Sequence, residues 1–308
     1  MTPPTLLAVP NVSEGRDQDT IAAIAAAFAS GAPDGPRVLD VHSDPDHHRS
    51  VFTIAARADE LVEALLRGAR LAVERIDVMS RAAHGAAQVG QHPHVGALDV
   101  APIVYLDPRD RGVACAQALV LGDRVGEELQ VPVFLYGELS GTDPASARTR
   151  AQLRRGGVAG LAARMAAGER GTVPDFGPQR MHASAGATLV AARPPLVAFN
   201  LQLAPPATVE DARAIAELIR EGGPSGLPGV RAIGIALSGG VAQVSMNVER
   251  PFEVPLALVI DAVRARAEVA SAELVGLAPA AALEGFPQDM PMPGFDPARH
   301  LIENALGC

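Results

Sequence analysis

The residues best suited to proton transfer lie in the segment Gln91-His92-Pro93-His94, just before an apolar run that ends at Val100. A neutral imidazole with an ordinary pKa of about 6.5 can take up and return a proton near neutral pH. The proline after His92 restricts the local backbone and helps to hold the ring in one place. His92 is therefore the candidate general acid and base. The alternative, from the residues alone, is that it caps the following strand or bonds a backbone carbonyl.

Metal binding is a second use for these side chains. Nitrogen and oxygen ligands could come from a set of histidines and acids, namely His47, His48, His92, His94, Asp44, Asp46 and Asp99. Residues two apart on a strand share a face, but Pro93 disfavours a regular strand between the two histidines. We therefore expect no metal, and a metal-dependent hydrolase stays as an alternative.

Two segments have the composition of carboxylate-binding sites. Residues 9–16 leave a strand and enter a helix, and such a junction presents backbone N–H groups and the positive end of a helix dipole. Plain capping by Ser13 or Asp17 is the alternative. In the charged turn at 40–49, Arg49 stands out because a guanidinium can bind a carboxylate through two parallel hydrogen bonds. A charged turn that is merely solvated is the alternative there.

Polar residues also interrupt the second half of the chain. Residues 174–188 form a turn-rich stretch with His182 and Ser184, which is either a linker or part of a ligand site. Asn200 and the amides of 243–247 lie on otherwise apolar strands. An amide on a strand usually faces solvent, but two such strands could hydrogen-bond a heterocycle or an amino acid.

The elements that must position these residues follow from apolar periodicity. In the first half the pattern predicts strands at 6–10, 38–41, 51–55 and 100–105, with helices at 17–30 and 59–76. A helix at 113–129, a strand at 131–136 and a helix at 146–166 follow. The order β-α-β-β-α-β is typical of the ferredoxin-like architecture.

The second half partly repeats this order. It predicts strands at 196–201, 230–237, 241–247 and 273–277, helices at 208–221 and 256–269, and a short final helix at 297–306. We therefore expect an α+β fold of two ferredoxin-like (βαββαβ) lobes, 1–190 and 191–308, flanking a cleft that is the default ligand site.

Composition narrows the class of protein. With 308 residues, 48% of them hydrophobic, the chain can bury a sizeable core. A net charge of −9 without a basic stripe argues against nucleic acid as a partner. Two cysteines are too few for a disulfide framework, and no apolar run reaches the length of a membrane span. We expect a cytoplasmic protein that acts on small molecules, with no membrane partner.

Several blocks in chain order resemble the formiminotransferase family, the folate-dependent glutamate formimidoyltransferases. The matching blocks are residues 9–16, 44–53, 92–100, 131–138, 174–178, 186–200, 242–247 and 273–277. The resemblance covers nearly the whole chain. It implies two ferredoxin-like lobes and pairing as a homodimer.

The resemblance also implies an activity, the transfer of a formimino group from N-formimino-L-glutamate to tetrahydrofolate, a co-substrate, in histidine degradation. By matching position, His92 is the expected catalytic acid and base, and 177–186 and 225–227 are the expected folate contacts. Together with the residues argued above, the candidate substrate and folate contacts are Asn11, Glu14, Arg16, Arg49, Gly177, Pro178, His182, Ser184, Gly186, Arg193, Asn200, Ser225, Gly226 and Leu227.

Two positions depart from the family pattern. His94 replaces the arginine of a His-Pro-Arg block, which exchanges a fixed charge for a titratable one. Gly157 and Val158 stand where the family often has an acidic residue and an aromatic one. Alternatives to the formimino transfer are therefore a folate-binding relative without this activity, and formyl transfer between N-formylglutamate and a reduced folate.

Overall fold

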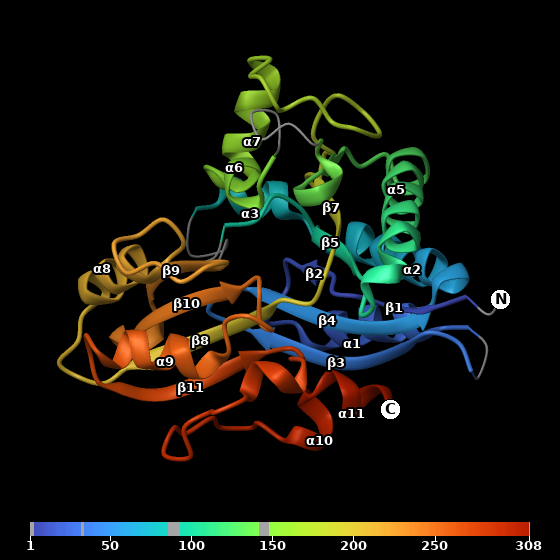
Figure 1. Cartoon of the computed structure of the whole chain (residues 1–308). Helices are drawn as coiled ribbons and strands as arrows, with labels where there is room; N and C mark the ends of the chain where they lie inside the picture. The colour runs from blue at the N-terminus through green and yellow to red at the C-terminus, as the bar shows by residue number, and fades with distance from the viewer. Residues whose placement is uncertain (1–2, 32–33, 86–92, 142–147, 308) are drawn as a thin grey trace. The chain divides into compact units, whose positions relative to one another are not determined.

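The protein is seen here as a computed structural model that describes residues 3–31, 34–85, 93–141 and 148–307. Contacts within the chain divide it into two compact units, Met1–Pro194 and Pro195–Cys308. Each unit is built on its own β-sheet (Figure 1). The predicted α+β class is confirmed, with helices and two sheets in one chain.

The first unit begins with an antiparallel arrangement. Its elements are β1 (Thr5–Ala8), β2 (Asn11–Val12), α1 (Gln18–Ala29), β3 (Arg37–Asp44), β4 (Arg49–Arg57), α2 (Ala58–Arg75) and β5 (Leu98–Val104). Strand β4 pairs with β3 on one side and with β1 and β2 on the other, and β1 and β2 also pair with β5. The ends of β2, β4 and β5 are thereby neighbours in the sheet.

The remainder of this unit extends the sheet. It contains α3 (Val78–Ala83), α5 (Arg111–Glu128), β6 (Val133–Leu135), α6 (Arg150–Arg154), α7 (Gly157–Ala166) and β7 (Thr188–Arg193). Strand β7 runs parallel to both β5 and β6 and lies between them, so the described sheet has seven strands. The described sheet therefore has two strands, β2 and β7, beyond the five that the sequence predicts in the first half.

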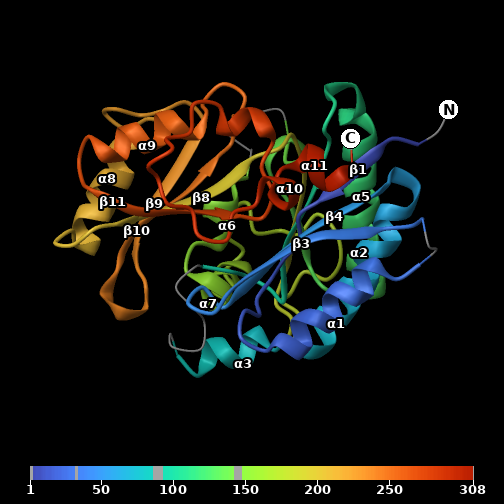
Figure 2. The ribbon, with the colours of Figure 1, turned by 90° about the horizontal axis from the view of Figure 1, so that it is seen from below.

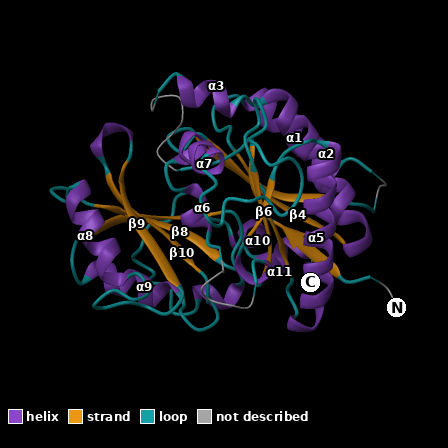
Figure 3. Cartoon of the chain, turned by 90° about the horizontal axis from the view of Figure 1, so that it is seen from above, coloured by secondary structure: helices purple, strands orange, loops and turns teal. Residues whose placement is uncertain are grey.

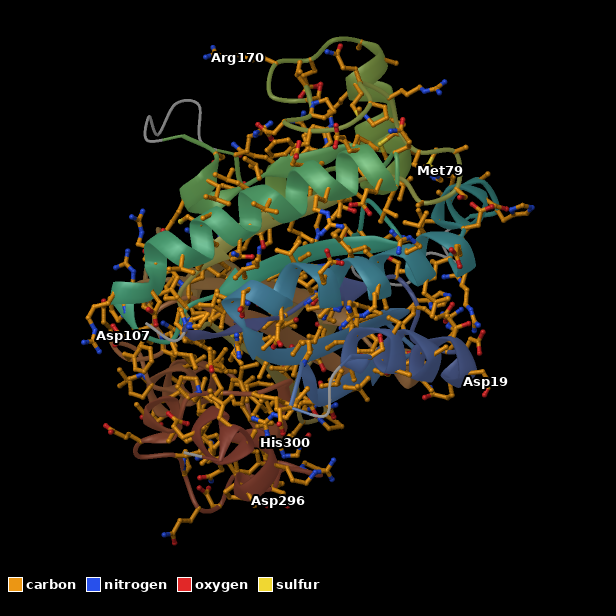
Figure 4. The ribbon with its side chains drawn as sticks, turned by 90° about the vertical axis from the view of Figure 1, so that its right-hand side faces the viewer. Asp19, Met79, Asp107, Arg170, Asp296 and His300 are labelled. Atoms are coloured by element: carbon orange, nitrogen blue, oxygen red, sulfur yellow. The ribbon has the colours of Figure 1, made fainter. Side chains whose placement is uncertain are left out.

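Side chains alternate along β5 and β7 between two apolar layers. Ala101 and Ile103 join the cluster that packs under α1, α2 and α5. Val100 and Leu189 join a second cluster with residues of α6 and α7. This sheet is thus covered on both faces, as expected where parallel strands are buried. Helices α1 and α2 lie side by side (Figure 2), and α5 lies next to α2 (Figure 4).

The second unit is an antiparallel sheet with two principal helices. Its elements are β8 (Val197–Leu203), α8 (Val209–Ile219), β9 (Val230–Ala236), β10 (Ala242–Val248), α9 (Leu256–Arg264), β11 (Val269–Val275), α10 (Pro297–His300) and α11 (Ile302–Leu306). The strand order is β11-β8-β10-β9. Alternate residues of β8, such as Phe199 and Leu201, share one core with α8 and α9 (Figure 3).

Three local predictions were wrong. The helix predicted at 146–166 is broken in its described part, because Gly156, between α6 and α7, has a φ of +76° in the left-handed region, which interrupts a right-handed helix. The helix predicted at 256–269 ends at Arg264, and the strand predicted at 273–277 runs from 269 to 275. Strand β7 and helix α3 were not predicted.

Candidate active site

The loop from β2 into α1 is fixed by contacts to three other segments. Ser13 donates its backbone N–H to the carbonyl of Ala97 and its hydroxyl to the carbonyl of Gly96. Gly15 lies so close to the turn after β3 that a Cβ there would come 2.2 Å from the carbonyl oxygen of Asp44. Only glycine fits this approach. Asp17 caps α1, which agrees with the capping alternative predicted from the sequence for residues 9–16.

Glu14 is a buried carboxylate inside this loop, with 3% of its surface exposed. Its Oε1 accepts hydrogen bonds from the backbone N–H groups of Arg16 and Asp17, at 2.9 and 3.1 Å. Its Oε2 forms an ion pair with Arg81, which also donates to the carbonyl of Ser13. Burial alone would raise the pKa of Glu14, but the backbone donors and Arg81 outweigh it and lower the pKa. The side chain is therefore ionised at neutral pH.

His48 lies against this carboxylate. It is 7% exposed, and its Nδ1 accepts the N–H of Gly15 at 3.1 Å and lies 3.3 Å from Oε1 of Glu14. The pKa of His48 is lowered to about 4, chiefly by burial; Glu14 opposes this shift, and the charges of Arg81, Arg16 and His94 add to it. His48 is thus a neutral ring whose Nδ1 is occupied as an acceptor, which leaves its proton on Nε2.

Arg49 follows at the start of β4 and is half-buried. Within the described chain, its side chain has no hydrogen bond and no ion pair. Burial lowers its pKa to about 10; the charge of Arg154 acts in the same direction, and Asp99 and Asp44 oppose it. Arg49 still carries its charge at pH 7, so its guanidinium is available to an anion.

Asp99 and Arg154 form a buried ion pair near Arg49. Asp99 is 1% exposed, accepts the N–H of Val95 at 2.8 Å through Oδ1, and takes one terminal N–H group of Arg154 through Oδ2. Arg154 is 7% exposed. Buried pairs of this kind fix geometry, because losing one partner leaves an uncompensated charge. Asp99 therefore ties α6 to the segment that leads into β5.

The loop 182–186 is held against that same segment. Ala97 donates to the carbonyl of Ala185, and Ala187 donates to the carbonyl of Val95. A Cβ on Gly96 would lie 1.8 Å from the carbonyl oxygen of Ala187. Gly186 has a φ of +73° and bridges to His182. Residues 95–97 and 185–187, far apart in the sequence, thus lie side by side.

His182 has its orientation set within this loop. Its Nδ1 accepts the N–H groups of Ala185 and Ser184 at 3.0 and 3.3 Å, and the ring is half-buried. A ring that accepts at Nδ1 carries its proton on Nε2 when it is neutral. His182 can therefore donate one hydrogen bond to a ligand acceptor.

Gly177 has a structural explanation. A Cβ at this position would lie 2.9 Å from Cα of Gly126 in α5 and 2.7 Å from the carbonyl oxygen of Val131. Asp175 and Phe176 hydrogen-bond to Val133, so the segment runs along β6. Pro178 is half-buried next to it. The glycine is needed by this packing whether or not a ligand contacts it.

The other candidate residues of the first unit do not all lie close together. Asn11 in β2 is half-buried and pairs with β4 and β5. Arg16 is exposed and donates to the carbonyl of Pro45. Arg193 ends β7 opposite Val104, five residues along β5 from Asp99, which is roughly 16 Å at about 3.3 Å per residue. The structure thus separates Arg193 from Arg49.

The candidates of the second unit stand on its sheet and on one loop. Asn200 in β8 is 3% exposed and donates to Glu273 of β11 at 2.8 Å. Ser225 and Leu227 donate their backbone N–H groups to the end of α8, and Gly226 packs against the carbonyl of Arg220. The contacts of residues 225–227 stabilise a turn after α8.

His92 lies outside the described residues, as do its neighbours back to residue 86. The first described residues after it are Pro93 and His94, and His94 is 6% exposed. Sequence reasoning missed Arg81 and Arg154, because nothing in their local pattern marks a buried arginine.

Among the described residues, no group of three or more His, Cys, Asp or Glu side chains could hold a metal ion. His47 Nε2 and Asp44 Oδ2 approach to 3.6 Å, but no further ligand joins them there. No helix in the described ranges is long and apolar enough to cross a membrane.

Known proteins share this arrangement of blocks. Residues 5–193 match the family described as "Formiminotransferase domain, N-terminal subdomain". The glutamate formimidoyltransferase of Streptococcus pyogenes serotype M1 is 34% identical over 308 residues, which covers 97% of this chain and 97% of that protein. The chain belongs to the formiminotransferase family. The resemblance that the ordered blocks indicate is thereby confirmed.

Other formiminotransferases align over most of the chain. The glutamate formimidoyltransferase of Thermoplasma acidophilum is 35% identical over 89% of this chain and 88% of its own length. The formimidoyltransferase-cyclodeaminase of Sus scrofa is 40% identical over 89% of this chain but only 50% of its own length. The chain thus spans about half the length of the formimidoyltransferase-cyclodeaminases it matches.

Proposed function

We propose that this formiminotransferase is a glutamate formimidoyltransferase, which moves the formimino group of N-formimino-L-glutamate to tetrahydrofolate in histidine degradation. The observation that carries the proposal is the alignment with the Streptococcus pyogenes glutamate formimidoyltransferase along nearly all of both chains. The convergence of 13–16, 48–50, 95–99 and 182–188 within the first unit supports it, because these segments belong to the blocks that carry the resemblance.

The reaction needs only movement of protons and one exchange of bonds. The secondary ring amine of tetrahydrofolate attacks the formimino carbon and forms a new C–N bond. The C–N bond to glutamate then breaks. The proton lost by the ring amine is returned to the glutamate nitrogen, so that glutamate leaves as a neutral or protonated amine. No oxidant, reductant or metal is required for this balance.

In this proposal His92 is the group that moves the proton. It accepts the proton from the attacking amine and donates it to the leaving nitrogen, a task suited to an imidazole with a pKa near neutrality. Glu14, paired with Arg81, stays negative and cannot act as the acid at neutral pH.

The remaining candidates are proposed as contacts to the glutamate donor or to the folate. Four candidates lie in β2, in the loop after it or at the start of β4, close to residues 95–99. They are Asn11, Glu14, Arg16 and Arg49. Proposed folate contacts are Gly177, Pro178, His182, Ser184, Gly186, Arg193, Asn200, Ser225, Gly226 and Leu227. His182 suits this role because its Nε2 remains free of the contacts that fix Nδ1.

We also propose the finer architecture that the family implies. The strand order β11-β8-β10-β9, with α8 and α9 as the two crossings, supports a ferredoxin-like lobe in the second unit. In the first unit β1 to β5 follow the same order of elements before β6 and β7 extend the sheet. The proposal also includes lobes at 1–190 and 191–308. We further propose that the protein is a homodimer in the cytoplasm and binds no metal.

The test is turnover by the purified protein with N-formimino-L-glutamate and tetrahydrofolate. We expect formimino-folate and glutamate in equal amounts. His92→Ala should reduce kcat by at least about 100-fold, the usual contribution of a general acid and base, while folate binding is kept. His84→Ala, at the exposed end of α3, is the matched control and should turn over normally.

Two results would lead to the alternatives. Folate binding without turnover by the wild-type protein would favour a folate-binding relative, for which His94 and Gly157 are the motivating departures. Turnover with N-formylglutamate in place of the formimino donor would favour formyl transfer. Full activity in His92→Ala would overturn the role of His92.

A further inference from the structure

Arg49 and Arg154 both lie close to Asp99, because Val12 of β2 pairs with Ser50 on one side and Leu98 on the other, and Asp99 forms an ion pair with Arg154. Both arginines have more hydrogen-bonding capacity than their described partners use. The side chain of Arg49 is half-buried and makes no hydrogen bond or ion pair with the residues that the structure describes. Arg154 is 7% exposed and gives one terminal N–H group to Asp99, but its Nε–H group is buried without an acceptor. A buried donor left without a partner is costly, so such a group calls for an explanation, and a bound water, ion or ligand that accepts the hydrogen bond is one.

The charges around this pair leave a positive excess. Asp99 neutralises one guanidinium, and its other oxygen is taken by the N–H of Val95. Asp44 is the second acid that acts on Arg49, but its Oδ1 accepts the N–H groups of Asp46 and His47 and its Oδ2 lies 3.6 Å from His47. Arg150 adds a further positive charge and lies over the ring of Tyr136.

The ligand that matches this arrangement is a planar anion that only accepts hydrogen bonds. A carboxylate has two oxygens with about four lone-pair sites and binds a guanidinium through parallel hydrogen bonds. We propose that Arg49 and Arg154 together bind one carboxylate of the glutamate donor, and that Asp99 is a positioning residue that orients Arg154. This inference rests on the proposed function and names the site of one of its substrates.

The donor fits this site better than the glutamate tail of folate. Val95, which Asp99 holds, follows His92 by three residues, so their Cα atoms can lie no more than about 11 Å apart at about 3.6 Å per residue. In the donor only a few bonds separate the reacting carbon from either carboxylate. In folate an aromatic ring and an amide lie between the reacting amine and the tail.

Two variants test the proposal in the full-length protein. Arg49→Gln removes the charge but keeps a hydrogen-bond donor. Arg154→Lys keeps a charge for Asp99 but lacks the Nε–H donor. Each should raise KM for N-formimino-L-glutamate about 10- to 100-fold, the effect of losing one hydrogen bond to a charged group, and leave KM for tetrahydrofolate unchanged. Arg155→Gln is the matched control, because Arg155 is exposed and pairs with Glu169.

Calorimetric titration with L-glutamate, the product, gives a readout that does not depend on turnover. We expect the wild-type protein to bind it, and both variants to bind it about 10- to 100-fold more weakly than Arg155→Gln. If the wild type binds glutamate but transfers nothing, the carboxylate site stands and the proposed function fails. Unchanged glutamate binding in Arg49→Gln, no binding in the wild type, or a rise in KM for tetrahydrofolate alone would overturn the inference.

Discussion

Glu14 connects parts of the first unit that are distant in the sequence. Its carboxylate binds the start of α1 through Arg16 N–H and Asp17 N–H, pairs with Arg81 from α3, and lies beside His48. Its carbonyl accepts the hydroxyl of Ser50 in β4 at 2.6 Å. A helix N-terminus and an arginine both favour a negative charge, so Glu14 orders this loop through its ionised form.

His48 should make stability depend on pH. Its folded pKa of about 4 lies below the ordinary 6.5, so between these values the unfolded chain binds a proton that the folded chain does not. The stability that neutral His48 contributes is complete above about pH 6.5 and is lost as the pH falls toward about 4. Between about pH 7.5 and about pH 5, the wild type should lose about 2 kcal/mol more of its free energy of unfolding than His48→Asn.

Urea unfolding of both proteins at these two pH values measures the difference. The amide oxygen of the introduced asparagine could still accept the N–H of Gly15, so the substitution removes mainly the titration. His84→Asn, on an exposed histidine, is the control and should follow the wild type. An equal loss in the wild type and in His48→Asn would show that His48 does not titrate in this range.

Individual site residues could be predicted from sequence only where a local pattern marks them. Glu14 and Arg49 were predicted as candidates, because Glu14 lies in a glycine-containing segment that enters a helix and Arg49 follows a charged turn. Arg81 and Arg154 have no such mark. Their partners, Glu14 and Asp99, are 67 and 55 residues away, so only the folded chain reveals them.

At the scale of elements, glycines decide where segments approach. In α5, Gly126 touches the backbone of Gly177, whereas Gly112 has nothing within 4 Å of the position of a Cβ. Gly126→Ala would place a Cβ 2.6 Å from the nitrogen of Gly177. We expect it to destabilise the protein by about 1–3 kcal/mol through overpacking, and to move the segment along β6.

Gly112→Ala in the same helix is the matched control. It should stabilise the protein by up to about 1 kcal/mol, because alanine has the higher helix propensity and meets no neighbour. Thermal and urea unfolding of the two variants compare them directly. Equal effects of the two substitutions would mean that α5 and residues 175–177 do not pack as described.

Helices with a strong apolar periodicity, or with a capping residue at the N-terminus, were predictable from the sequence. Helix α1 begins where Asp17 caps it, and α2 matches the predicted range within one residue at each end. Strand β7 was missed because it follows a glycine-rich and proline-rich stretch and is a short apolar run buried on both faces, which lacks the alternation of a half-exposed strand. The break before α7 needs the positive φ of Gly156, which a helical pattern hides.

At the scale of the whole molecule, each unit has its own core. In the second unit this core includes Phe199, whose ring meets Phe286 edge to face at a centroid distance of 6.3 Å. All pairings of its four-stranded sheet lie within residues 197–275. The repeated order of elements was predictable from sequence, and β6 was predicted as a strand, but β7, which joins β6 to the first sheet, was not.

Residues 195–308 should therefore fold when expressed alone. We expect a dispersed amide NMR spectrum and one cooperative thermal transition, because the sheet, both helices and the core are complete within this segment. Phe199→Ala in the same fragment should cost about 3–5 kcal/mol and broaden the spectrum. A fragment without dispersed signals would contradict the independence of this unit.

The central claim, that the chain transfers a formimino group to tetrahydrofolate, is tested most directly by following the carbon itself. N-formimino-L-glutamate labelled with ¹³C in the formimino group, mixed with tetrahydrofolate and the purified protein, can be observed by NMR. The account predicts that the label leaves glutamate and appears on the folate ring nitrogen as free glutamate accumulates, and that His92→Ala slows this while His84→Ala does not. A label that stays on glutamate in the presence of bound tetrahydrofolate would contradict it.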